Sequence, residues 1–566
     1  MAKTPASTPI GKISLVSLAI AATICSTSAN AQLTQNITIG NPKALALGHA
    51  VTADPPGIDS IHFNPAGLAK IQGRQQQLKL LAAHITFEAQ FGESEIPEDR
   101  QLALCSVTEE CDINDPDDVA SVWPEDNNAA GRKSETSDPV LMLPGAGLTP
   151  VPFLAVPFGG IAVEDPNYGW TFATSVYSPQ AIGYERGEND PATYQGKTVG
   201  ISRITYFSPS VGFHFNDELM IGASIGFSWQ GLGIETRFRA PDTVLAYIAD
   251  LSGDIDETGI EGLELNAIQP YDTVGTLTME LEDALSLSFN LGVLWEPTEW
   301  ISFGFVYQSE AKSDLEGDFE MIYTDGTGTG MDNANWLAMT EAMQHNALFD
   351  DVIIPLLSGG SLNAQKSEKG SVTLEYILPQ HISFGTSVKV LPDLKLNFDV
   401  KWTDYDTWES LDFKFDQDVD FLTIASIFYE LIPGDNADPN EMRIPRQYES
   451  EWNFAIGLEY EYNDNLLLRC GYEPRNSVIP DDRVDLLAPI AGADLYSFGF
   501  GYRLDAYSQV DFAFGYLTSE FDADAGESQN ANSNKSGEVV YNPYAYQSIA
   551  AQTTAYLFAL SYDTKF

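Results

Sequence analysis

Basic residues are scarce in this 566-residue chain, which has 29 Lys and Arg against 81 Asp and Glu and a formal net charge of −52. A surface of this sign repels phosphate backbones and excludes nucleic acid as a partner. The excess of acid favours solubility in a salty medium. It also suits bridging by divalent cations to anionic lipid at a cell surface, and both interpretations stay open.

Cysteine is rare as well, at four residues. Cys105 and Cys111 lie in one acidic segment, where an exported chain can keep a disulfide as a loop staple. No histidine or further cysteine lies near them, so the pattern predicts no metal site. Nothing else in the sequence calls for a cofactor.

Long apolar runs are missing after residue 31, since no stretch reaches the roughly 18 residues of a membrane-spanning helix. The N-terminus combines Lys3 and Lys12 with a short apolar run over residues 13–24 and a small-residue end, ANA. This organisation is typical of a secretory signal. We therefore expect residues 1–31 to be a signal peptide and the mature chain to be exported.

What the chain has in abundance is period-two alternation. From Trp452 to Tyr460, and again from Tyr496 to Tyr502, large apolar residues alternate with polar or very small ones. Successive side chains of a strand point to opposite faces, so each segment has one apolar and one polar face. Aromatic residues at both ends of the apolar rows are typical of a transmembrane barrel. A large soluble β-sandwich or solenoid alternates too.

The lengths of the connections separate these alternatives. Turns after even-numbered strands are short, as at 216–218 and 462–464, whereas gaps after odd-numbered strands are long, as at 92–149 and 325–369. Short periplasmic turns and long outer loops belong to an even-stranded membrane barrel. The sequence thus predicts an all-β, transmembrane, antiparallel β-barrel of about fourteen strands over residues 73–566, with strands near 74–91, 150–162, 168–185, 200–215, 218–240, 280–295, 299–324, 370–390, 394–414, 447–461, 465–476, 493–503, 508–522 and 553–566.

Two segments do not fit a regular wall. Residues 32–72 are too apolar for a disordered tail and too rich in Pro and Gly for a strand, so we expect them to plug the lumen as an N-terminal hatch. In the third strand, Pro179 has no N–H for the ladder, and Gly183 follows it. We expect a kink or gap in the wall from Ser178 to Gly183, although an ordinary bulge near the rim would also place a proline there.

Five stretches in order carry a family resemblance. FNPAGLA (63–69) stands directly before the first strand, and VYSPQAIGYE (176–185) and FVYQSEAKSDLEGDF (305–319) follow. Residues 378–408 and 466–487 continue the series. Together they resemble the FadL-type family of outer-membrane transporters for long-chain fatty acids and other hydrophobic compounds. The last strand ends in Phe566, which resembles the signal read by the barrel assembly machinery, although Thr564 departs from the usual apolar residue or Tyr.

The resemblance implies passive uptake of fatty acid across the outer membrane of a Gram-negative bacterium. Cargo would be caught by outer loops, would pass to an inner pocket and would leave sideways through a gap at the third-strand kink, among membrane lipid and lipopolysaccharide. For a carboxylate head group it implies a ligand-binding cation inside the barrel, for which Lys312 and Arg237 are the candidates by motif. Trp336, Met339 and Met343 share one face at helical spacing, where they would either bind apolar cargo or pack together as the core of a lid. The resemblance implies gating roles for Phe63, Asn64, Pro65 and Ala66 in the hatch and for Pro179 and Gly183 in the kink.

Three alternatives remain at this level. The same family includes carriers of aromatic hydrocarbons, and the sequence does not choose between the two cargoes. His381-Ile-Ser383 resembles the His-x-Ser core of outer-membrane phospholipase, which would make the protein a lipid hydrolase. The alternation, however, places His381 and Ser383 toward the lumen rather than the lipid. A cation-selective porin with an acidic lumen is the third alternative, against which the apolar plug argues.

Overall fold

The alternating segments form one antiparallel sheet that closes on itself. The structure, a computed structural model, describes residues 36–94, 128–151, 154–239, 271–431, 438–533 and 542–566, with a few isolated positions between them. Closure is made by β21 (Gln547–Lys565), which pairs with β1 (Arg74–Ser94) along almost its whole length. Because a closed sheet has no free edge, its backbone groups can all be paired within the bilayer.

Fourteen strands build this wall. Most are continuous: besides β1 and β21, they are β4 (Leu154–Asp165), β5 (Trp170–Arg186), β8 (Leu219–Arg239), β9 (Thr273–Thr298), β18 (Leu466–Arg475), β19 (Ala493–Arg503) and β20 (Ser508–Ala523). The others are each interrupted once: β6 (Thr198–Phe207) with β7 (Ser210–His214), β10 (Ile301–Gln308) with β11 (Ala311–Tyr323), β12 (Ser367–Leu378) with β13 (His381–Leu391), β14 (Leu394–Thr403) with β15 (Ser410–Phe415), and β16 (Glu441–Pro445) with β17 (Glu451–Asn463).

The predicted barrel and strand number are therefore confirmed, and the strands lie close to their predicted positions, although residues 273–279 of β9 and 441–445 of β16 were expected in loops. Large apolar side chains such as Phe498 and Leu285, 56% and 54% exposed, stand on the outer face. In water such exposure would be unfavourable, but on a barrel it forms the lipid-facing band. Among the described residues, no helix is both long and apolar enough to cross a membrane.

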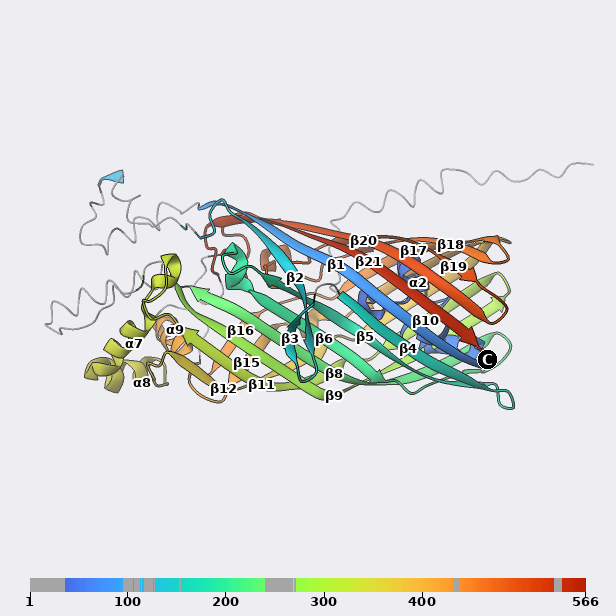
Figure 1. Ribbon diagram of the computed structural model, residues 1–566, viewed down its shortest axis with the longest axis horizontal. Coiled ribbons are helices and arrows are strands. Elements are labelled where there is room, and N and C mark those ends of the chain that lie inside the picture. Colours follow the sequence, from blue (N-terminus) through green and yellow to red (C-terminus); the bar gives the residue numbers. More distant parts are fainter. Residues whose placement is uncertain are drawn as a thin grey trace, which may run out of the picture.

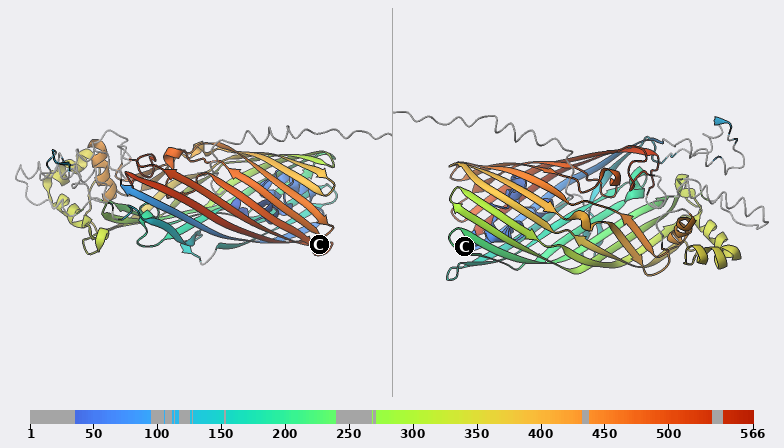
Figure 2. Two further views of the ribbon diagram at one scale, coloured as in Figure 1. Left: turned by 90° about the horizontal axis from the view of Figure 1, so that it is seen from above. Right: turned by 180° about the vertical axis from the view of Figure 1, so that it is seen from behind.

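Short helices occupy the lumen and the outer end (Figures 1 and 2). The segment from Asn36 to Ile71 lies inside the barrel, toward the end where the C-terminus lies, and contains η1 (Ile37–Ile39), α2 (Pro42–Ala46), η2 (Gly57–Asp59), α3 (Ser60–Phe63) and η3 (Pro65–Lys70). At the other end lie η4 (Pro191–Gln195), η6 (Gly330–Asn333), α7 (Trp336–His345), η7 (Phe349–Ile353), α8 (Ile354–Leu357), α9 (Asp420–Leu431) and η9 (Asp481–Arg483), whereas η8 (Tyr405–Thr407) bridges β14 and β15.

Wall glycines make room for the hatch. A Cβ on Gly222 would come within 2.2 Å of the backbone of Pro65, and one on Gly292 within 2.1 Å of the Asn64 side chain. Other wall glycines at which an added Cβ would come within 3.0 Å of a hatch residue are Gly160, Gly212, Gly304, Gly385, Gly457, Gly471, Gly499 and Gly515. The glycines on the luminal faces of the strands thus let the hatch pack closely against the wall.

The predicted second strand begins with an excursion that the sequence did not reveal. Chain segment β2 (Lys133–Leu143) pairs briefly with β1 and β5, turns, and returns as β3 (Gly147–Pro150) before the wall resumes with β4. This hairpin crosses the outside of the wall (Figure 1). It packs against a row of glycines that lie opposite one another on three strands, Gly183, Gly200 and Gly233.

The hairpin is held to the wall by two carboxylates on β9. The N–H of Leu148 donates to Glu280 at 2.8 Å, and the N–H of Gly145 donates to Glu282 at 3.3 Å. The indole of Trp229 donates to the same Glu282 at 3.0 Å. The polar groups of the turn are therefore satisfied by the wall beneath it.

Candidate functional site

The Asn64-Pro65-Ala66 turn is fixed against the wall through the side chain of Asn64. Its amide nitrogen donates to the carbonyls of Thr52 at 2.7 Å and of Val293 at 3.2 Å, and its oxygen accepts the N–H of Ala66 at 3.1 Å. Pro65 begins η3 at a position where a missing N–H costs nothing. One side chain thus joins two parts of the hatch to strand β9.

The wall is interrupted between β5 and the broken strand β6–β7. Residues 170–173 pair with residues 210–213, and the next pair is formed only at Tyr177. Between these points the hydroxyl of Ser208 replaces the ladder: it accepts the N–H of Ser175 at 2.9 Å and donates to the carbonyl of the same residue at 2.7 Å. The hydroxyl of Thr174 also accepts the N–H of Ser208 at 3.2 Å, so side chains of these two residues span the gap.

A second irregularity follows at Pro179, where the register shifts between Tyr177 and Gln180. The hydroxyl of Ser178 lies within hydrogen-bond distance of the carbonyls of Gln180 (2.9 Å) and Arg203 (2.7 Å). The irregularity expected at Ser178 and Pro179 is thus present. On the β6 side regular pairing resumes at Gln180, and Gly183 lies directly opposite Gly200. On the other side of β5 the ladder with β4 ends at Val176, and pairing with β2 begins only at Tyr184, so residues 177–183 have no ladder partner there. The missing side chain of Gly183 makes room for the outer hairpin.

The hatch touches the wall at this same place. Thr38 donates its hydroxyl to the carbonyl of Ser178 at 2.9 Å. The ring of His62 contacts those of Phe63 and Tyr177, with centroids 5.2 and 5.4 Å apart. Burial lowers the pKa of His62 to about 3, assisted by the charge of Lys79. The imidazole is therefore neutral at physiological pH, and nothing in this contact is charged.

An apolar groove of about 530 Å³ opens on the lipid side of the interruption. It is lined by residues of four neighbouring wall segments, among them Phe172, Phe207, Pro209, Ala223 and Ile225. Ser224, which also lines it, donates to the carbonyl of Ile61 in the hatch at 2.9 Å. Only the thickness of the wall separates the groove from the plug.

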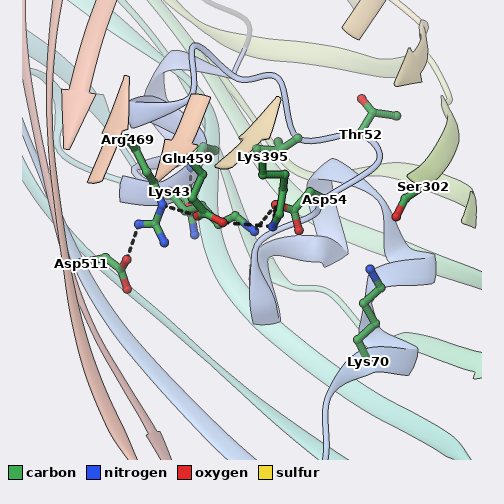
Figure 3. Close-up of polar contacts among 12 residues, drawn as sticks. Lys43, Thr52, Asp54, Lys70, Ser302, Lys395, Glu459, Arg469 and Asp511 are labelled. Atoms are coloured by element: carbon green, nitrogen blue, oxygen red, sulfur yellow. Dashed lines mark hydrogen bonds and ion pairs between the residues drawn. The ribbon is translucent and has the colours of Figure 1, made fainter. Parts of the chain in front are cut away.

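A chain of buried and partly buried charges ties the hatch to the wall at β14, β17 and β18 (Figure 3). Asp54 accepts from Lys43 of the hatch and from Lys395 of β14, both at 2.9 Å. Lys395 also reaches Glu459 at 3.0 Å, and Arg469 joins Glu459 at 2.7 Å. Burial alone would raise the pKa of Asp54, but Lys395, Lys43 and Lys70 outweigh it and hold that pKa well below its usual range. The carboxylate is ionised and clamped.

The predicted capture residues Trp336, Met339 and Met343 lie together on α7, each at most 5% exposed. They belong to a large apolar cluster that fills the outer lumen and includes Phe421 and Ile424 of α9. In this state the three side chains are lid core rather than open surface. Both roles were left open by the sequence, and a lid that opens would expose the same side chains to cargo.

Two buried acids lie where this lid meets the wall. Asp420, at the start of α9, accepts the N–H groups of Asn363 and Ala364 at 2.6 and 2.7 Å, and its own N–H donates to Glu368 at 3.1 Å. The hydroxyl of Tyr323 donates to Glu368 at 2.5 Å. Burial, reinforced by the charge of Glu368, raises the pKa of Asp420 from 3.8 to about 7.

We expect the lid to loosen as the pH rises through about 7. A carboxyl whose pKa is raised on folding stabilises the folded state at low pH, and this stabilisation is lost as it ionises. Protection factors of residues 336–345 and 420–431, which correct for the base-catalysed intrinsic exchange rate, should be higher at pH 6 than at pH 8. Asp420→Asn should give the same high protection factors at both values. Equal protection of the wild type at both would contradict the prediction.

The two predicted head-group cations lie away from the lumen. Lys312 is exposed and pairs with Glu375, and Arg237 pairs with Glu188 at 2.8 Å. Val306 is buried and faces the lumen, so an uninterrupted alternation of faces along the strand would also turn Lys312 toward the lumen. The break between β10 and β11 shifts the alternation by one residue, so that Ala311 and Ser313 are buried instead.

The remaining sequence candidates are placed as follows. His381 bonds to Thr403 at 2.9 Å, and Ser383 bonds to Thr52 of the hatch at 2.6 Å. Each is thus engaged by a threonine on the luminal side, and neither bonds to the other. Cys105 is disulfide-bonded, and its predicted partner Cys111 lies outside the described residues.

A plugged and interrupted barrel of this kind has known counterparts. A sequence profile of the outer membrane protein transport protein family (OMPP1/FadL/TodX) matches residues 18–566. The chain belongs to this family. It is 20% identical over 360 residues to the long-chain fatty acid transport protein of Escherichia coli O6:H1. The aligned region covers 63% of this chain and 68% of that protein.

Solved structures of FadL-type proteins share the fold. A Pseudomonas aeruginosa FadL homologue superposes with a TM-score of 0.61 at 17% identity, covering 95% of this chain and 100% of the other. The toluene transporter TbuX of Ralstonia pickettii has a TM-score of 0.53 at 14% identity, covering 94% and 99%. Membership of this family makes the chain an outer-membrane transport protein. Its relatives are transport channels rather than enzymes.

Sequence reasoning missed several parts of this FadL-type site. The bridging hydroxyl of Ser208 had one available signal, the Ser-Pro pair that it forms with Pro209, which repeats the pair at Ser178 and Pro179. The clamp around Asp54 had no local signal, because Lys395 is 341 positions away.

Proposed function

We propose that this FadL-type protein takes up long-chain fatty acids or similarly elongated hydrophobic molecules and releases them sideways into the outer membrane. The supporting observation is the missing stretch of ladder at Ser208, with the apolar groove on its lipid side and the hatch directly behind it. The Escherichia coli relative is named for long-chain fatty acid transport. The sideways exit lies between β5 and β7.

A lateral route suits a greasy cargo. Keeping an acyl chain out of water is worth roughly 0.8 kcal/mol per methylene group, so release through an open aqueous pore would be strongly unfavourable. The lid residues Trp336, Met339 and Met343 supply the first apolar surface, and flexible methionine suits cargo of varied shape. For the cargo to reach the groove, the contacts of Thr38 and His62 with the kink must loosen. This gives Phe63, Asn64, Pro65 and Ala66 a gating role, because their turn holds the hatch in place.

Native mass spectrometry of protein extracted in mild detergent tests the cargo. Co-purification of acyl chains, together with loss of growth on oleate when the gene is deleted, is the expected result. Unchanged growth on oleate with loss of growth on toluene would instead assign an aromatic cargo, as TbuX is named to carry. Lipid hydrolysis abolished by Ser383→Ala would contradict transport as the sole activity.

The ends of the chain have proposed roles as well. Residues 1–31 would be the cleaved signal peptide, residues 32–72 the hatch and residues 73–566 the barrel. Phe566, 70% exposed beyond the last strand, offers its ring to the barrel assembly machinery. The acidic outer surface would meet lipopolysaccharide through divalent cations.

A further inference from the structure

Arg203 is a buried cation that forms no ion pair among the described residues, and the carboxylate of Asp283 acts on it only at longer range. Its side chain is among the largest that are fully buried, and only 1% of the residue is exposed. One terminal nitrogen donates to the hydroxyl of Ser286 at 3.0 Å and to the amide oxygen of Gln230 at 3.5 Å. The other terminal nitrogen has no partner there.

Most other buried cations of this acidic protein contact a carboxylate. Lys79 lies 2.7 Å from Asp59, and Arg446 lies 2.6 Å from Asp485. Lys401 lies 2.8 Å from Glu473. Burying a charge without a counter-charge is costly, so such pairing is the expected arrangement. Arg203 departs from it in a chain where acids outnumber bases almost threefold, 81 to 29. Arg186, 2% exposed, has no carboxylate partner among the described residues either, but its guanidinium group donates to several backbone carbonyls, which Arg203 does not.

The guanidinium group faces the lumen at the level of the kink. Arg203 lies directly opposite Gln180 in the sheet, so the two side chains share a face. Gln180 in turn bonds to the hydroxyl of Tyr376 at 3.0 Å. Because β5 and β12 are separated by several strands on either side of the barrel, this bond crosses the lumen. Ser178, beside Pro179, bonds to the backbone of Arg203 itself.

Apolar residues begin immediately outward of this polar layer. Ile201, two positions from Arg203 on the same face, packs against the large apolar cluster of the outer lumen. Leu232, two positions from Gln230, belongs to that cluster, as does Tyr376. Arg203 thus lies at the inner limit of the packed apolar cluster and beside the wall interruption.

We propose that Arg203 binds the carboxylate of an anionic long-chain cargo at this inner limit, with the chain extending outward through the apolar cluster. The inference rests on the proposed function and specifies its cargo, since an arginine that forms no ion pair favours an acid over a neutral hydrocarbon. Carboxylate and guanidinium form strong, charge-assisted hydrogen bonds. The competing explanation is structural: through Ser286, Arg203 would only join β6 to β9.

Binding of two cargoes of equal chain length separates these explanations. Oleate and oleyl alcohol would be titrated into purified protein in mild detergent, with heat-modifiable gel mobility confirming a folded barrel. Arg203→Gln should weaken oleate binding about 10- to 100-fold, the range expected for one hydrogen-bonded charge pair, and should change oleyl alcohol binding less than about twofold. Arg203→Lys should recover part of the loss. Lys312→Gln, which removes an exposed cation on the outer wall, should leave both affinities unchanged.

Several outcomes would overturn the assignment. Equal weakening of both cargoes by Arg203→Gln, or weakening of neither, would reduce Arg203 to a structural role or to none. A wild-type protein that binds oleyl alcohol but not oleate would contradict the anionic cargo while leaving hydrophobic transport in place. Binding of neither cargo would contradict the proposed function itself.

Discussion

Ala223→Trp is expected to slow oleate uptake at least tenfold while the barrel stays folded. Ala223 lines the groove of about 530 Å³ beside the interrupted ladder, and an indole there would fill the passage between wall and lipid. Because the site faces lipid, the larger side chain need not overpack a core. An added barrier of only about 1.4 kcal/mol slows a step tenfold. Uptake of radiolabelled oleate by whole cells measures the effect.

The matched control is Val390→Trp, which places the same side chain on the lipid-facing wall at a 48% exposed position that does not line the groove. It should leave uptake unchanged, so that indole crowding of the bilayer is accounted for. If both variants or neither slowed uptake, the exit would have to lie elsewhere.

Asp54→Ala is expected to unseat the hatch and let ions through the barrel. The change removes the carboxylate that lies 2.9 Å from both Lys43 and Lys395, and only Lys395 keeps another acid, Glu459, beside it. Removing one member of a fully buried ion pair costs about 3–5 kcal/mol, most of it from the charge left behind. These side chains are 16–23% exposed, so the cost here is expected to lie below that range. The wall itself keeps its ladder. In planar bilayers the wild type should pass almost no steady current, and the variant should conduct.

Glu296→Gln provides the comparison for that experiment. Glu296 pairs with Lys70 of the hatch at 2.7 Å, but both side chains are about one-third exposed, 33% and 35%. Such a pair contributes about 0–1 kcal/mol. Its loss should leave the current near the wild-type level. A silent Asp54→Ala channel would mean that other contacts suffice to hold the plug.

The wall could be predicted from sequence because alternation is local. The sequence of each strand shows which side chains face the lipid and which face the lumen, and the ends of segments such as 493–503 were predicted to the residue. Where a strand is interrupted, the alternation no longer predicts which face a side chain takes. The break at Ser309 and Glu310, before Ala311, reversed the face assigned to Lys312 and turned an expected luminal cation outward.

The luminal site was less accessible to sequence reasoning because it is assembled by register between distant strands. Asn64 was recognised through its Asn-Pro-Ala turn, yet its partner Val293 is 229 positions away. Arg203 carries no local mark: its importance comes from what does not lie beside it, and that is visible only in three dimensions.

The hairpin formed by β2 and β3 has a consequence for biogenesis. Its seat is made of Gly183, Gly200 and Gly233, which come from three strands that follow it in the chain, and its two anchoring acids come from β9. This docking surface forms only after those strands have inserted into the bilayer and paired with one another. The hairpin can therefore dock only late in folding. Its resistance to protease would report that strands β5 to β9 have assembled in the barrel wall.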